Sequence, residues 1–270
     1  MPLIRFILTA AMRDRLMLTL ALLIVTGAAV SVFLGAATIT EKESFALVFG
    51  ASGLRFLGVL GIVLFCCFYV RRAFETKEVE FLLSRPLSRM TFLFSHASAF
   101  IVLSVTMAVA ICAAIFFLGK PSLEGLALWS GSFAVELSIM SIAALFFSMV
   151  ISSASGAALA TLGFYVLARL IGTLLGIAYQ APENMIFAIL NNCMELISVL
   201  IPRLDLMAQT SWLVYGVEAS GGIAYTKDAG AFAYRLISTL GLGGFMLAQG
   251  VLSISVLALA AAFDFLRREF

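Results

Sequence analysis

The chain has 270 residues, of which 63% are hydrophobic and only 12% are Asp, Glu, Lys or Arg. Soluble domains carry about 25% charged residues, so this chain has too few charges to cover a surface that faces water. The net charge of +2 is small and the basic residues are scattered along the chain, which argues against a nucleic-acid partner.

Long stretches with almost no charge recur along the sequence, as expected for helices that cross a bilayer in about 20 residues each. They predict an all-α integral membrane fold in which residues 1–270 form a single transmembrane domain with six transmembrane helices. The expected spans cover residues 16–38, 54–70, 91–118, 126–151, 157–178 and 237–262.

Residues 1–15 precede the first span and are predicted to form an interfacial helix that lies on the membrane. Arg5, Thr9 and Arg13 recur at intervals of four, which places them on one helical face. The apolar residues between them occupy the opposite face, which we expect to rest on the lipid.

The longest charged segment covers residues 71–89, directly after the second span, which we expect to end at Arg71 and Arg72. Phe74, Phe81 and Leu82 share one face at helical spacing, so the segment is predicted to be a short amphipathic helix parallel to the membrane. An ion pair is expected four residues apart, between Arg71 and Glu75. The alternative is a solvated loop that only orients the protein by its charge.

Two charges are expected inside the bilayer, Glu136 in span four and Arg169 in span five. The tight turn at 152–156 joins these spans, so the two residues should lie within about 5 Å of equal depth. We expect an intramembrane charge pair that satisfies both groups. A part in substrate passage or in a gate is the alternative, because charges inside membranes often mark such routes.

Residues 179–236 are predicted to form an extracytoplasmic region between spans five and six. The run 185–201 is long enough to be a seventh span. Glu195 would make this run costly to bury in lipid, so we expect a re-entrant or interfacial helix instead. Trp212 and Tyr215 suit an aromatic belt at the level of the lipid headgroups.

The distribution of basic residues predicts the orientation. The segments expected inside, which are 1–15, 71–89, the 152–156 turn and the tail, hold ten basic residues, whereas the outer segments hold six, including Arg55 near the mouth of span two. By the positive-inside rule, both termini are therefore expected to be cytoplasmic.

No catalytic site and no metal site are expected. The four cysteines have no paired metal-ligand spacing, and the single histidine, His96, lacks companion ligands. The pair Gly119 and Lys120 is followed by Pro121 and lacks the preceding glycine of a phosphate-binding loop. The chain is therefore predicted to contain no cofactor of its own.

The residues at 74–89 read Phe-Glu-x-x-x-Val-Glu-Phe-Leu-Leu-Ser-Arg-Pro-Leu-Ser-Arg, which resembles the coupling-helix segment of ABC-2 type permeases. The order of parts along the chain, from interfacial helix to basic tail, is also similar to that family. The stretch 201–205 resembles a Pro-Asn-hydrophobic-acidic motif of its outer region, although Arg203 replaces the asparagine.

The resemblance implies the transmembrane subunit of an exporter in a bacterial plasma membrane. A separate ATP-binding cassette subunit, present in two copies, would bind ATP and Mg²⁺, and a second permease copy or paralogue would complete the assembly. The resemblance assigns contact with the ATPase to residues on the coupling helix. These residues are Phe74, Glu75, Glu78, Glu80, Phe81, Leu82, Arg85 and Pro86.

Two other classes of function stay open. A secondary transporter or channel would depend on Glu136, Arg169 and Glu195, and such proteins usually show internal repeats, which this sequence lacks. A membrane-embedded enzyme would need His, Asp or Glu clustered at one membrane face, and no such cluster is visible in the sequence.

Overall fold

The computed structural model describes residues 2–13, 15–38, 41–76, 88–179, 185–216 and 231–267. Over these ranges the chain is helical and contains no strand, and six helices are long and apolar enough to cross a membrane. They are α2 (Arg15–Ala37), α3 (Lys42–Glu75), α5 (Arg89–Leu118), α6 (Leu123–Val150), α7 (Ala154–Tyr179) and α11 (Ala231–Arg267). Among the described residues, the prediction of six helices long and apolar enough to span a membrane is confirmed, as expected for a multi-pass membrane protein.

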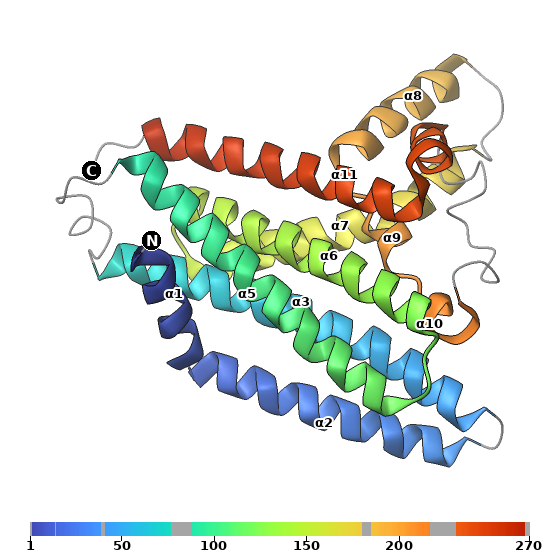
Figure 1. Ribbon diagram of the computed structural model, residues 1–270. Helices are drawn as coiled ribbons and strands as arrows, with labels where there is room; N and C mark the ends of the chain where they lie inside the picture. The colour runs from blue at the N-terminus through green and yellow to red at the C-terminus, as the bar shows by residue number, and fades with distance from the viewer. Residues whose placement is uncertain are drawn as a thin grey trace.

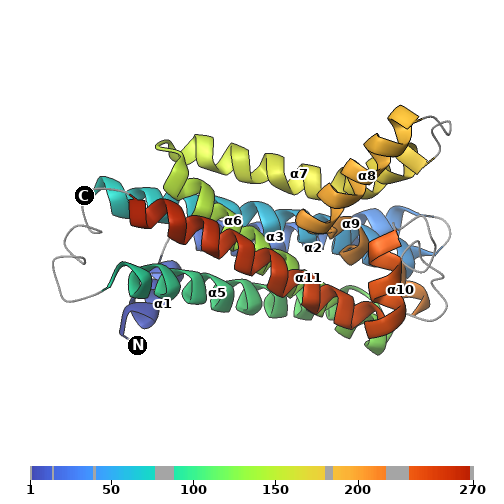
Figure 2. The ribbon, with the colours of Figure 1, turned by 90° about the horizontal axis from the view of Figure 1, so that it is seen from above.

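Helix α6 is the core of the bundle and packs against α3, α5, α7 and α11 (Figures 1 and 2). Of the residues in the apolar span of α6, 72% are buried, compared with 17% of those in the span of α2, which lies at the edge of the bundle. Gly58 of α3 and Gly250 of α11 approach α6 so closely that a Cβ atom at either position would overlap a side chain of α6. The hydroxyls of Ser138, Ser141 and Ser148 donate to carbonyls of α6 itself, so these buried polar groups are satisfied within the helix.

The start of α1 (Pro2–Arg13) and the end of α11 lie at the same end of the bundle (Figure 1). Helix α1 runs at an angle to α2 and packs against the beginning of α5. It buries Ile7 and Ala11, four residues apart, while Arg5 and Arg13 remain exposed. This helix therefore has one buried face and one charged face.

Helix α3 is longer at both ends than the second predicted span. It begins at Lys42, twelve residues before the expected start, and continues past Arg71 and Arg72 to Glu75. Residues 44–54 contain no charge and no proline, so nothing ends the helix there. The result is a single rod of 34 residues, about 51 Å long.

Within the described residues, three shorter helices follow α7 and precede α11, at the end of the bundle opposite the termini. They are α8 (Met185–Leu200), α9 (Leu204–Met207) and α10 (Ser211–Tyr215). Helix α10 packs on the first turns of α6, where the amide of Ser122 donates to the carbonyl of Leu213 at 3.0 Å. Trp212 is therefore 1% exposed, and the expectation that it belongs to a lipid-facing aromatic belt is wrong, although Tyr215 is 65% exposed.

Helix α11 is kinked at Gly241, whose φ of 72° and ψ of 170° are not helical. Only glycine adopts this backbone conformation without strain. The kink divides the expected sixth span into a short segment near α8 and a long segment that runs back toward the termini (Figure 1).

Candidate functional site

A cluster of charged side chains lies deep inside the bundle, centred on Glu136 of α6, which is fully buried. Arg169 of α7 donates from Nη2 to Oε1 of Glu136 at 3.1 Å. Arg55 of α3 contacts the other carboxylate oxygen, Oε2, through Nε and Nη2 at 2.5 Å. The structure thus brings together the expected pair, Glu136 and Arg169, and adds a second arginine. We call Arg55, Glu136 and Arg169 the buried triad.

The sequence placed Arg55 near the mouth of span two, which is wrong. Because α3 begins at Lys42, Arg55 lies 13 residues inside the helix and is 1% exposed. A signal for this was present in the sequence, since Arg55 is the only charged residue between positions 44 and 70. A run of that length is long enough to cross the bilayer with the arginine inside it.

Aromatic rings surround the Arg55 guanidinium. Its central carbon lies 5.3 Å from the ring centre of Trp129 and 5.2 Å from that of Phe133, and Nη2 donates to the Ser132 hydroxyl at 3.3 Å. Within the described part of the chain, Nη1 of Arg55 and Nε1 of Trp129 are buried without a hydrogen-bond partner. Cation–π attraction to the rings therefore offsets part of the cost of burying this charge.

Arg169 connects the buried triad to the segment that follows α8. It donates to the Tyr165 hydroxyl from Nη2 at 2.9 Å and from Nε at 3.1 Å, and its side chain is 27% exposed. Asp205 lies within electrostatic range of Arg169 and pairs with Arg203 through two bonds of 2.8 and 2.9 Å. Charges of alternating sign therefore run from α9 to α3.

The charges in this arrangement do not balance within the described residues. Glu136 is the carboxylate that both Arg55 and Arg169 contact. Removing one partner from a buried ion pair leaves an uncompensated charge at a cost of about 3–5 kcal/mol. The triad is therefore a site at which a single substitution has a large effect.

Gly172 positions Asp205 beside α7. It lies one turn after Arg169, and a Cβ atom at this position would overlap the Asp205 carboxylate and lie 3.1 Å from Nη2 of Arg203. The substitution Gly172→Ala is therefore expected to displace the Arg203–Asp205 pair and to destabilise the protein by about 1–3 kcal/mol. Thermal unfolding in detergent measures this.

The matched control for this substitution is Gly176→Ala on the same helix, because nothing lies within 4 Å of a Cβ atom there. Alanine is a better helix former than glycine by about 1 kcal/mol, so this variant should be neutral or slightly stabilising. Equal behaviour of Gly172→Ala and Gly176→Ala contradicts the assigned packing.

The structure describes two of the residues assigned to the coupling helix. Phe74 and Glu75 form the last turn of α3, and the Arg71 guanidinium lies 5.7 Å from the ring centre of Phe74. The expected ion pair between Arg71 and Glu75 is not among the ion pairs formed by described residues. The remaining coupling residues lie outside the described part of the chain, and these are Glu78, Glu80, Phe81, Leu82, Arg85 and Pro86.

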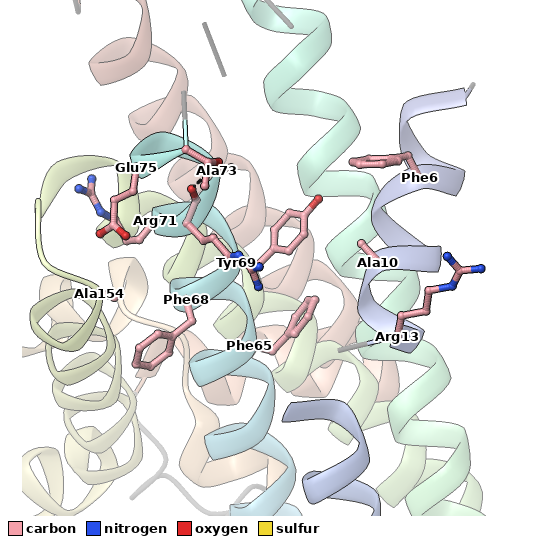
Figure 3. A pocket seen from close by; sticks show the side chains of 12 residues that line it. Phe6, Ala10, Arg13, Phe65, Phe68, Tyr69, Arg71, Ala73, Glu75 and Ala154 are labelled. Atoms are coloured by element: carbon pink, nitrogen blue, oxygen red, sulfur yellow. Dashed lines mark hydrogen bonds between the residues drawn. The ribbon is translucent and has the colours of Figure 1, made fainter. Parts of the chain in front are cut away.

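A cleft of about 940 Å³ lies at the same end of the bundle, between α1, the last turns of α3 and the start of α7 (Figure 3). Phe65 and Tyr69 point from α3 toward α1, whereas Arg71 and Glu75 lie on the side of α3 toward Ala154. We call this the terminal cleft. It combines aromatic walls with arginines from two helices.

No protein-family model matches this chain, and no curated protein matches it. Over the described ranges, no group of three or more His, Cys, Asp or Glu side chains is placed to hold a metal ion. His96 is buried and its Nδ1 lies 2.9 Å from the carbonyl of Phe92. Within the described residues, the buried triad and the terminal cleft are the candidate functional sites.

Proposed function

We propose that this protein is the transmembrane subunit of an ATP-driven exporter of the ABC-2 type, and that it works with a separate subunit that binds ATP and Mg²⁺. The observation that carries the proposal is the motif at 74–89, which resembles the coupling-helix segment of that family. Glu75 in the last turn of α3 and Ser88, the N-cap of α5, lie near the two ends of this motif. Each belongs to or borders a spanning helix, so a force on the segment acts on both helices.

Helix α3 offers a route from the coupling segment into the bundle. Twenty residues separate Glu75 from Arg55, which is about 30 Å along a continuous helix. The Arg55–Glu136 contact then joins α3 to α6, and Arg169 joins α6 to α7. A displacement of the segment by the ATPase would move three helices together through the buried triad.

The proposed orientation has both termini in the cytoplasm of a bacterial cell. With Arg55 inside the bundle, the six basic residues counted for the outer segments become five, against ten for the inner ones. The ends of α1, α3 and α11 then share the cytoplasmic side, where an ATPase subunit has access (Figure 1). Two permease chains, identical or paralogous, would pair with two ATPase chains.

A secondary transporter or channel is the second candidate function. It is favoured by the 27% exposure of the Arg169 side chain, which leaves one member of the buried triad partly open. Charged groups at such a depth often line the route of an ion or a substrate. Transport that continues in vesicles without ATP would support this candidate and contradict the exporter.

Copurification tests the proposed exporter. The protein should retain an ATP-binding subunit during purification from its native membrane, and removing residues 74–86 should abolish this pairing while membrane insertion continues. Reversing two charges of the segment by Glu78→Lys with Glu80→Lys should weaken the pairing and lower MgATP hydrolysis by the complex by about tenfold or more, because charge pairs across an interface set specificity.

The matched control reverses Glu41→Lys with Glu43→Lys, which have the same spacing and lie at the opposite end of the bundle. This variant should pair and hydrolyse ATP like the wild type. Copurification of the protein with no ATP-binding subunit, or unchanged pairing after removal of residues 74–86, contradicts the proposal.

A further inference from the structure

The terminal cleft has two chemically different regions. Its deeper part is aromatic: Phe65 is buried and points toward α1, whereas Phe68 is 47% exposed and lies on the side of α3 toward Ala154 (Figure 3). Its rim carries Arg71 and Arg72 from α3 and Arg13 from α1. A ligand that fills it would therefore need an apolar part and a group that accepts hydrogen bonds from guanidinium.

The lining carries an excess of positive charge. Among the described residues that line the cleft, three arginines stand against one acid, Glu75. Nε of Arg71 is buried and has no hydrogen-bond partner within the described residues, and its guanidinium lies over the ring of Phe74. A buried donor of this kind costs free energy unless a ligand satisfies it. An anionic oxygen is the acceptor that a guanidinium binds best.

Phe68 lies about one helical turn from the two arginines along α3. Phe68 precedes Arg71 and Arg72 by three and four residues, which corresponds to about 5–6 Å along the helix. The headgroup layer on each side of a bilayer is about 5–8 Å thick. If the arginines lie at the headgroups, Phe68 faces the acyl chains.

We propose that the terminal cleft binds one anionic phospholipid from the adjacent leaflet, with its phosphate on Arg71 and Arg72 and an acyl chain along Phe68. Arg13 borders the headgroup from α1, so a bound lipid joins α1 to α3. Basic pockets between spanning helices are known to bind anionic headgroups, whereas zwitterionic lipids gain less from an excess of arginine. The site does not depend on the proposed transport activity.

Native mass spectrometry of the intact protein tests the proposal. The protein is reconstituted with phosphatidylglycerol and phosphatidylcholine, extracted into mild detergent, and its retained lipids are counted. We expect retention of phosphatidylglycerol by the wild type and a loss of about tenfold or more in Arg71→Gln with Arg72→Gln, because each basic residue contributes to the attraction. The variant Arg71→Lys with Arg72→Lys keeps both charges and should retain the lipid more strongly than the glutamine variant.

Two matched controls distinguish lipid retention by the cleft from retention caused by general surface charge or surface hydrophobicity. Arg5→Gln with Arg15→Gln removes two exposed arginines that lie at the same end of the bundle as the cleft but do not line it. This variant should change lipid retention by less than about twofold. Phe68→Gln should lower retention, whereas Phe56→Gln, on the same helix and 52% exposed, should not. Equal losses in the cleft variants and in their controls overturn the proposal.

A competition distinguishes a lipid from a free anion. Inorganic phosphate at millimolar concentration should leave bound phosphatidylglycerol in place, since the aromatic region of the cleft contributes to binding. Displacement by inorganic phosphate assigns the arginines to a free anion and overturns the lipid site. Unchanged retention in Arg71→Gln with Arg72→Gln, in protein that elutes as a single folded species, also overturns it.

Discussion

Replacing Glu136 by glutamine is expected to destabilise the protein by about 3–5 kcal/mol, because the substitution leaves buried Arg55 and partly buried Arg169 without their shared carboxylate. The side-chain volume stays nearly the same, so the effect reports on charge and not on a cavity. Thermal unfolding in detergent or unfolding by a denaturing detergent measures the loss. Glu124→Gln is the matched control, since Glu124 is an exposed residue of the same helix and should change stability by about 0.5 kcal/mol or less.

A second substitution, at a partner of Glu136, tests why Glu136→Gln loses stability. If the loss comes from uncompensated positive charge, adding Arg55→Gln to Glu136→Gln should recover part of the stability, since fewer unpaired charges remain buried. A double variant that is as unstable as the sum of the two single variants contradicts the shared carboxylate.

The pairing of Glu136 and Arg169 has a functional test as well. Glu136→Gln and Arg169→Met are compared singly and together for transport, in preparations that fold normally. Simple pairing predicts that the double variant transports better than the worse single variant. A double variant as impaired as the worse single variant assigns these residues a part in substrate passage or in a gate.

Adding one methyl group at Gly125 is expected to detach α10 from α6. A Cβ atom there would overlap the backbone carbonyl of Trp212, and a backbone atom cannot move aside as a flexible side chain can. The variant Gly125→Ala should therefore lose about 2–3 kcal/mol of stability, as expected for overpacking in a close contact. The Ser122–Leu213 hydrogen bond of 3.0 Å beside it should break with the same displacement.

Tryptophan fluorescence follows this displacement directly. The chain has two tryptophans, Trp129 and Trp212, and both are buried, so acrylamide should quench the wild type weakly. Quenching should rise in Gly125→Ala as Trp212 becomes accessible. Gly131→Ala, on the same helix with nothing within 4 Å of its Cβ, is the control and should keep both quenching and stability. Unchanged quenching in Gly125→Ala would falsify the assigned contact.

Arg55 and Trp212 depart from what their local sequence predicts for one physical reason. Local sequence predicts a charge near the mouth of a span and an aromatic residue near the headgroups. Each is instead buried by contacts with residues far along the chain, since Arg55 meets Glu136 81 positions later and Trp212 meets Gly125 87 positions earlier. Local propensity contains no information on such contacts.

The sequence by itself determined the six spanning helices, because a backbone in lipid must satisfy its hydrogen bonds within each segment and the apolar runs mark those segments directly. It also predicted a shared depth for Glu136 and Arg169, since a short hairpin joins their helices. Only the tertiary structure decided that Arg55 completes the triad and that the segment after α8 folds back onto α6. Those contacts depend on how the helices pack, and packing is set by side chains distant in the sequence.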